Sequence, residues 1–189
     1  MICSCFAMWS CDKKPASHTG FTRADSLTET YLALQDTMLQ AWNTMIHDDN
    51  RKIKAMKSLL HELSVSNPEK KDELKAYEER LEDLTSIRYD QNTMSDAEIV
   101  SEYDLASNSL VSELIALAES QKEFAYNKTL QKLADTIRAA DQRVSTYREE
   151  YDFITSRFNM FIEGNRDLLQ DIHEDSFLKK KPLFQMAAE

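Results

Sequence analysis

LQKLADTIRAADQRVSTYREEYDFITSRFNMFIEGNRDLLQDI, residues 130–172, is the most regular stretch of the chain. Apolar residues recur along it at alternating intervals of three and four, beginning with Leu130 and passing through Phe158. This spacing places one apolar stripe along one side of an α-helix and is typical of helices that pack together along their length. The stretch therefore predicts a single long helix from about Asn127 to Asp175.

Three further segments show the same helical period. The first begins at a predicted capping box, 26–29, and extends to about Ser64. The second begins at Asn67-Pro68, and the third at another predicted capping box, 95–98. With 2 Gly and 3 Pro in 189 residues, few residues interrupt these helices. We therefore expect an all-α fold, an elongated antiparallel up-down bundle of four helices, two long and two short.

Composition argues against several classes of function. The formal net charge of −10 disfavours binding to nucleic acid, whose phosphates an acidic surface repels. Two glycines are too few for a glycine-rich nucleotide-binding loop. The His-Glu pairs have the wrong order and spacing for the carboxylate–histidine sites of di-iron bundles. We expect no metal, no cofactor and no catalytic residue.

All three cysteines lie within the first eleven residues. A mostly apolar run ends in a small residue followed by Cys11, which resembles the cleavage site of a bacterial lipoprotein. Residues 1–25 are therefore interpreted as a signal and lipid anchor on Cys11, followed by a polar tether. Two alternatives remain open: an unstructured tail, or a zinc site formed by Cys3, Cys5, Cys11 and His18.

The last predicted helix also carries a pattern that resembles the C-terminal signature of the LemA family. In that family an Arg-x-x-Tyr-Asn run is followed seven residues later by Tyr-Asn. The corresponding residues here are Arg148, Tyr151, Asp152, Phe158 and Asn159. Asp152 replaces the first Asn of the pattern and Phe158 replaces the second Tyr.

The first predicted helix adds Ala41-Trp42, which is similar to an Ala-Trp run of the same family. The resemblance covers roughly residues 27–184, and residues 26–178 would form the LemA-like bundle. It implies a helical bundle held at a bacterial membrane by its N-terminus, with no established activity and no catalytic residues to carry over.

Residues 179–189 form a basic and then aromatic tail on an otherwise acidic chain. One interpretation is a solvated chain end. The other is a contact with the membrane surface, because lysines gain energy near anionic headgroups.

Two charged residues, Asp49 and Lys52, occupy stripe positions of the first predicted helix where apolar residues are expected. A local shift of the stripe would turn them outward. Alternatively they form a candidate buried polar layer in which Asp49 pairs with Arg143 or Arg148. In the second case Asp49→Leu is predicted to raise the melting temperature.

The predicted function is that of a membrane-tethered, non-catalytic, LemA-like protein of the bacterial cell envelope. We expect it to bind membrane lipid through its N-terminus, and also to bind a protein partner of unknown identity. Phe153, which lies off the stripe, is a candidate docking residue. A soluble coiled-coil oligomer without a membrane role is the alternative, and a helical-bundle metalloenzyme is a weaker one.

Overall fold

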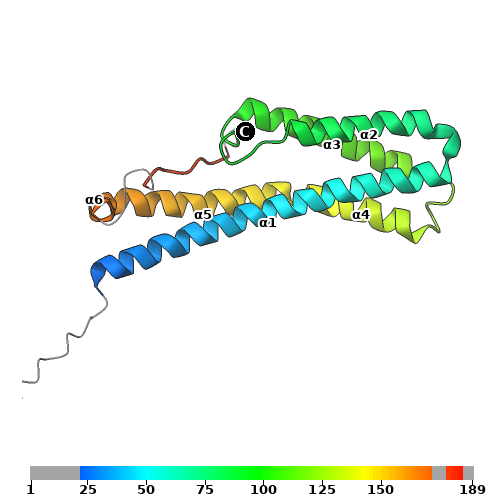
Figure 1. Ribbon diagram of the computed structural model, residues 1–189. Coiled ribbons are helices and arrows are strands. Elements are labelled where there is room, and N and C mark those ends of the chain that lie inside the picture. The colour runs from blue at the N-terminus through cyan, green and yellow to red at the C-terminus, as the bar shows by residue number, and fades with distance from the viewer. Residues whose placement is uncertain (1–21, 172–177, 185–189) are drawn as a thin grey trace, which may run out of the picture.

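A computed structural model describes residues 22–171 and 178–184 (Figure 1). The all-α prediction is confirmed, since these residues contain helices and connecting segments and no strand. The elements are α1 (Arg23–Ser66), the 3₁₀ helix η1 (Pro68–Lys70), α2 (Lys71–Ser86), α3 (Ala97–Glu119), α4 (Lys128–Gln142), α5 (Val144–Gly164) and α6 (Arg166–Gln170). Cys11 and the lipid anchor predicted on it lie outside the described residues, as do residues 185–189 of the tail.

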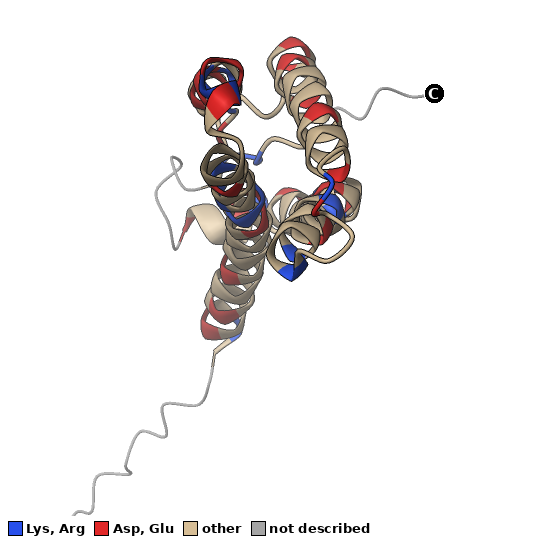
Figure 2. Ribbon diagram, turned by 90° about the vertical axis from the view of Figure 1, so that its right-hand side faces the viewer, with Lys and Arg blue, Asp and Glu red and all other residues tan. Residues whose placement is uncertain are grey.

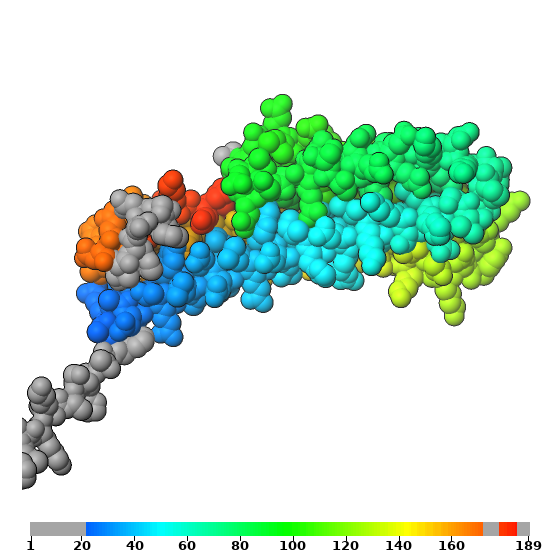
Figure 3. All heavy atoms as spheres, in the orientation of Figure 1, coloured from blue at the N-terminus to red at the C-terminus, as the bar shows by residue number. Residues whose placement is uncertain are grey.

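The 44-residue helix α1 extends along the molecule and would measure about 65 Å at 1.5 Å per residue. Helices α4 and α5 follow one another along it (Figure 1). Helices α2 and α3 pack on the part of α1 that α4 contacts, so the bundle is thick there and thinner where α1 packs mainly against α5 (Figure 3). Among the described residues, no helix is long and apolar enough to cross a membrane.

Side-chain hydrogen bonds to backbone N–H groups mark the first residues of α1, α3 and α4. Helix α1 begins at a capping box formed by Thr22 and Asp25, so the predicted box at 26–29 is wrong by four residues. The third helix is capped by Asp96, one residue after the predicted cap. Asn127 caps α4 as expected, because its side-chain oxygen accepts from two backbone N–H groups of the first turn.

The single long helix expected at the end of the chain is divided into α4, α5 and α6, with breaks at Arg143 and Asn165. The predicted stripe is partly confirmed in α5, because Tyr151 and Phe158 are buried. The other buried positions of α5 are Arg148, Thr155 and Ile162, each one residue after a predicted stripe position. The buried residues of α4 and α5 therefore keep the same seven-residue register across the break at Arg143.

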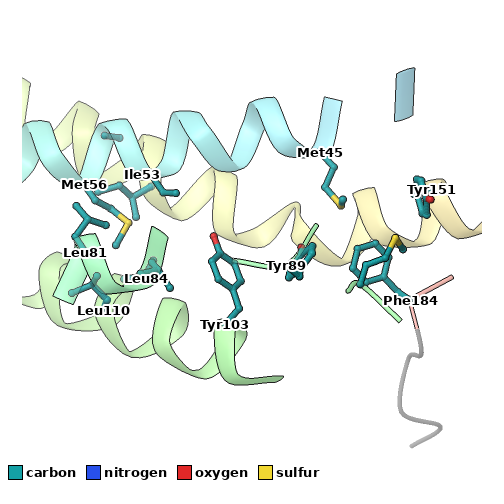
Figure 4. Close-up of a cluster of buried hydrophobic side chains, with 14 of the residues drawn as sticks. Met45, Ile53, Met56, Leu81, Leu84, Tyr89, Tyr103, Leu110, Tyr151 and Phe184 are labelled. Carbon is teal, nitrogen blue, oxygen red and sulfur yellow. The ribbon is translucent and has the colours of Figure 1, made fainter. Parts of the chain in front are cut away.

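The core changes in character along the bundle (Figure 4). In the thick part it is aliphatic, with Met56, Leu81 and Leu110 almost fully buried. Toward α5 it becomes aromatic, and Tyr103, Tyr89 and Phe184 follow one another with adjacent ring centroids 5.4 Å apart. The transition coincides with a set of buried and half-buried charges beside the junction of α4 and α5.

Candidate functional site

The charged side chains beside the α4–α5 junction form what we call the central polar layer. It contains four carboxylates and four cations, contributed by α1, α3, α4, α5, the α2–α3 connection and the junction residue Arg143. Its members are Asp48, Asp49, Lys52, Arg88, Asp104, Asp141, Arg143 and Arg148.

Lys52 occupies the middle of this layer, and its side chain is 2% exposed. Its Nζ donates to the Ser107 Oγ at 2.8 Å and lies 3.5 Å from carboxylate oxygens of both Asp49 and Asp141. A buried ammonium requires such partners, because isolated burial of a charge costs on the order of several kcal/mol. The buried position of Lys52 is therefore compensated from α1, α3 and α4.

Asp49 is bound by donors from two other parts of the chain. The Tyr103 hydroxyl lies 2.7 and 2.9 Å from its two oxygens, and the Arg88 Nε lies 3.2 Å away. Burial, followed by the charge and hydrogen bond of Asp49, raises the pKa of Tyr103 well above its usual range. Tyr103 therefore stays protonated and serves as a donor to the carboxylate.

The structure places Arg143 on Asp48, whereas the sequence predicted Asp49 as its partner. The guanidinium binds Asp48 through Nε at 3.1 Å and through Nη2 at 2.7 and 2.9 Å. This change of partner follows from the rotation of about 100° between adjacent helical residues, which turns Asp48 toward the junction and Asp49 toward α3.

Arg148, the other predicted partner of Asp49, pairs with Asp104 of α3. Its two terminal nitrogens each lie 2.7 Å from a carboxylate oxygen, and Nη2 also donates to the Tyr89 hydroxyl at 3.1 Å. Its guanidinium lies 5.0 Å from the centre of the Phe184 ring. Burial by itself lowers the pKa of Arg148, but the bonds to Asp104 and Tyr89 raise it overall, so the side chain is a permanent cation.

A cavity of about 300 Å³ adjoins the layer and is lined by polar groups that include Asn108 and Ser145. Most of the charged groups facing it are already bound to one another. Within the described part of the chain, no three His, Cys, Asp or Glu side chains are placed to hold a metal ion.

Beside the layer, residues 178–184, which we call the tail segment, lie along α5. Asn159 binds the backbone of Lys181 twice, donating to its carbonyl at 2.9 Å and accepting from its N–H at 2.8 Å. Asp152 accepts from the N–H of Phe184 at 2.9 Å. Leu178 and Phe184 are buried. The segment from Leu178 to Phe184 is thus packed against the bundle, in contrast to a freely solvated end.

The residues that carried the LemA resemblance come together here. Asp152 and Asn159 bind the tail segment, and Arg148 faces its phenylalanine. The Tyr151 ring contacts both Phe184, at 5.9 Å, and Trp42, at 5.6 Å.

The two remaining signature residues are buried nearby, with Ala41 in the α1 face and Phe158 against Tyr31 at 5.5 Å. Sequence reasoning missed the role of the polar members. The available signal was the spacing of four and seven residues from Arg148 to Asp152 to Asn159, which puts all three on one side of α5.

Known protein families, curated proteins and solved structures were all compared with this chain, and none of them matches it.

Proposed function

We propose that this chain is a membrane-tethered, non-catalytic helical bundle of the bacterial cell envelope that binds another protein. Its helices would act as an elongated, antiparallel up-down bundle, similar in kind to the LemA family. Lipid attached to Cys11 would hold the chain at the membrane.

The pairing of charges in the central polar layer is the observation that carries the non-catalytic part of the proposal. Each of its four carboxylates lies within 3.6 Å of a cation of the layer. A general acid or base needs a proton that it exchanges with a substrate, and a nucleophile needs a free electron pair. Charges that neutralise one another between helices instead fix how the helices align, a known use of buried polar residues.

The position of α1 is compatible with a tether. Its capping box at Thr22 and Asp25 begins the helix directly after the polar stretch 12–21, so a chain anchored at Cys11 would enter the thin end of the bundle. Acidic side chains are spread over the helices, which favours solvation of the body (Figure 2).

Protein binding draws support from large apolar side chains on the surface of the thin part. Phe153 of α5 is 64% exposed and Met160 is 63% exposed, seven residues apart on one side of the helix. Exposed aromatic and methionine side chains are typical of interaction surfaces.

Mass spectrometry of protein extracted from native membranes, beside a Cys11→Ala version, tests the tether. We expect the wild-type mass to show loss of residues 1–10 and gain of acyl groups, and the variant to lack both changes. An unmodified full-length wild-type mass in the soluble fraction would refute the tether and favour the soluble coiled-coil oligomer.

A further inference from the structure

The seat of the tail segment has the geometry of a peptide-binding groove. Asn159 and Asp152 are seven residues apart, about 10 Å along a helix. The backbone groups that they bind, on Lys181 and Phe184, are three residues apart, also about 10 Å in an extended chain. The spacing of these two polar side chains on α5 therefore matches the spacing of backbone groups three residues apart in an extended peptide that runs antiparallel to the helix.

These polar contacts are made to main-chain atoms. Asn159 binds both the N–H and the carbonyl of Lys181, and Asp152 binds the N–H of Phe184. Main-chain contacts of this kind give affinity for any extended segment, while side-chain pockets select its sequence. Both bound positions exclude proline, because each of them donates its N–H to a side chain of α5.

Selection comes from the pocket that holds the Phe184 ring. Tyr89 and Tyr151 meet this ring edge-on, with centroids 5.4 and 5.9 Å away, and the Arg148 guanidinium lies over its face at 5.0 Å. Edge-on aromatic neighbours and a cation over the ring face are specific for an aromatic residue. Figure 4 shows the Phe184 ring between Tyr89 and Tyr151.

Charge also favours a basic ligand in this groove. The tail segment carries three consecutive lysines, and Lys180 pairs with Glu163 of α5 at 3.0 Å. The Asp152 carboxylate lies directly beneath the segment. The rest of the chain is strongly acidic, so a basic segment is attracted to it before contact is made.

The tail segment is also held in a way that permits exchange. Its main-chain contacts with α5 are three hydrogen bonds at two positions, and Lys179 and Lys180 between its buried ends are exposed. We infer that the tail groove, formed by Arg148, Asp152 and Asn159 with the two tyrosines, binds an extended basic–aromatic segment of a partner protein in place of the chain's own tail. This inference rests on the proposed function and names the chemistry of the partner.

Fluorescence anisotropy with a labelled synthetic peptide tests the inference. The probe is Leu-Lys-Lys-Lys-Pro-Leu-Phe with an amidated end, which has the sequence of residues 178–184. The receptor is the full chain carrying Phe184→Ala, in which the tail lacks its aromatic ring and competes poorly. We expect saturable binding to this variant, and binding at least about tenfold weaker to wild type, because a tethered segment competes at an effective concentration in the millimolar range.

Two controls locate the binding. A peptide with alanine in place of phenylalanine should not bind the Phe184→Ala receptor. The original peptide should not bind a receptor that carries Asn159→Leu in addition to Phe184→Ala. Circular dichroism establishes that each receptor is folded. If Phe184→Ala does not fold, the full chain with Lys181→Pro, which loses the N–H that Asn159 accepts, serves as the receptor.

Absence of saturable binding to a folded receptor would overturn the inference, as would equal binding to the Asn159→Leu receptor. A wild-type dimer that is lost in both Phe184→Ala and Asn159→Leu would overturn the assignment to a different protein, because the occupant would then be the tail of a second copy. The assay uses purified protein in solution, so a negative result leaves the lipid tether of the proposed function unaffected, and the mass measurement on Cys11 is equally independent of the groove.

Discussion

Replacing Asp49 with leucine is the sharpest test of the central polar layer. If the layer were an inward-facing pair of charges and nothing more, a leucine of similar size would raise the melting temperature, which is the prediction attached to the buried-layer interpretation of the sequence. The contacts reverse this expectation, because Asp49 is the common acceptor for Tyr103, Arg88 and Lys52.

The size of the effect follows from what each donor loses. The buried Tyr103 hydroxyl would have no carboxylate to donate to, which costs about 1–3 kcal/mol. Lys52 would keep its contacts with Asp141 and Ser107. The stability lost through the broken Lys52–Asp49 pair is therefore a fraction of the roughly 3–5 kcal/mol found when a buried ion pair is broken completely. Burial of the leucine offsets about 1–2 kcal/mol. The net destabilisation is then about 2 kcal/mol, or a fall in melting temperature of about 4–8 °C for a chain of this length.

Thermal and urea unfolding followed by circular dichroism measure this change. Asp36→Leu is the matched control, since Asp36 is an exposed aspartate of the same helix and its substitution should change stability by less than about 0.5 kcal/mol. Adding Tyr103→Phe completes a double-mutant cycle, in which removing the hydroxyl should recover part of the loss. A melting temperature for Asp49→Leu equal to or above wild type would refute the reasoning.

Two further predictions concern the body of the bundle. Phe158 is 0% exposed, so Phe158→Asp should abolish the cooperative unfolding transition, whereas Glu150→Gln at an exposed position of the same helix should leave the midpoint unchanged; an unfolded Glu150→Gln variant would argue against this packing. Hydrogen bonds from Arg80 and Ser109 lower the pKa of Glu113 from 4.5 to about 2, so this carboxylate stabilises the fold above about pH 4.5 and the contribution is lost as the pH falls toward 2. Both side chains of the Arg80–Glu113 pair are about two-fifths exposed, so solvent screening limits the stabilisation to under about 1 kcal/mol. The free energies of unfolding of wild type and Glu113→Gln, measured from neutral to acid pH, should therefore converge at low pH.

The site was only partly predictable, and the reason differs from residue to residue. Lys52 interrupted an apolar stripe, and its burial was one of two interpretations that the sequence left open. The partner of Arg143 was not predictable, because Asp48 and Asp49 are adjacent and the choice between them depends on how α1 is rotated against the junction. Asp104 and Tyr89 gave no signal, since their contacts join segments 44 and 59 residues away from Arg148.

The sequence by itself determined that the chain is helical, because helical periodicity and caps such as Asn127 are local properties of neighbouring residues. It also determined most of the buried face of α1, since a 3–4 spacing keeps the same side of one helix buried. Only the tertiary structure decided the break at Arg143, the partners of the buried charges and the docking of Phe184. These features depend on which segments pack against each helix, here α1, α3 and the tail segment. A periodic pattern along one helix carries no information about how its neighbours are rotated against it.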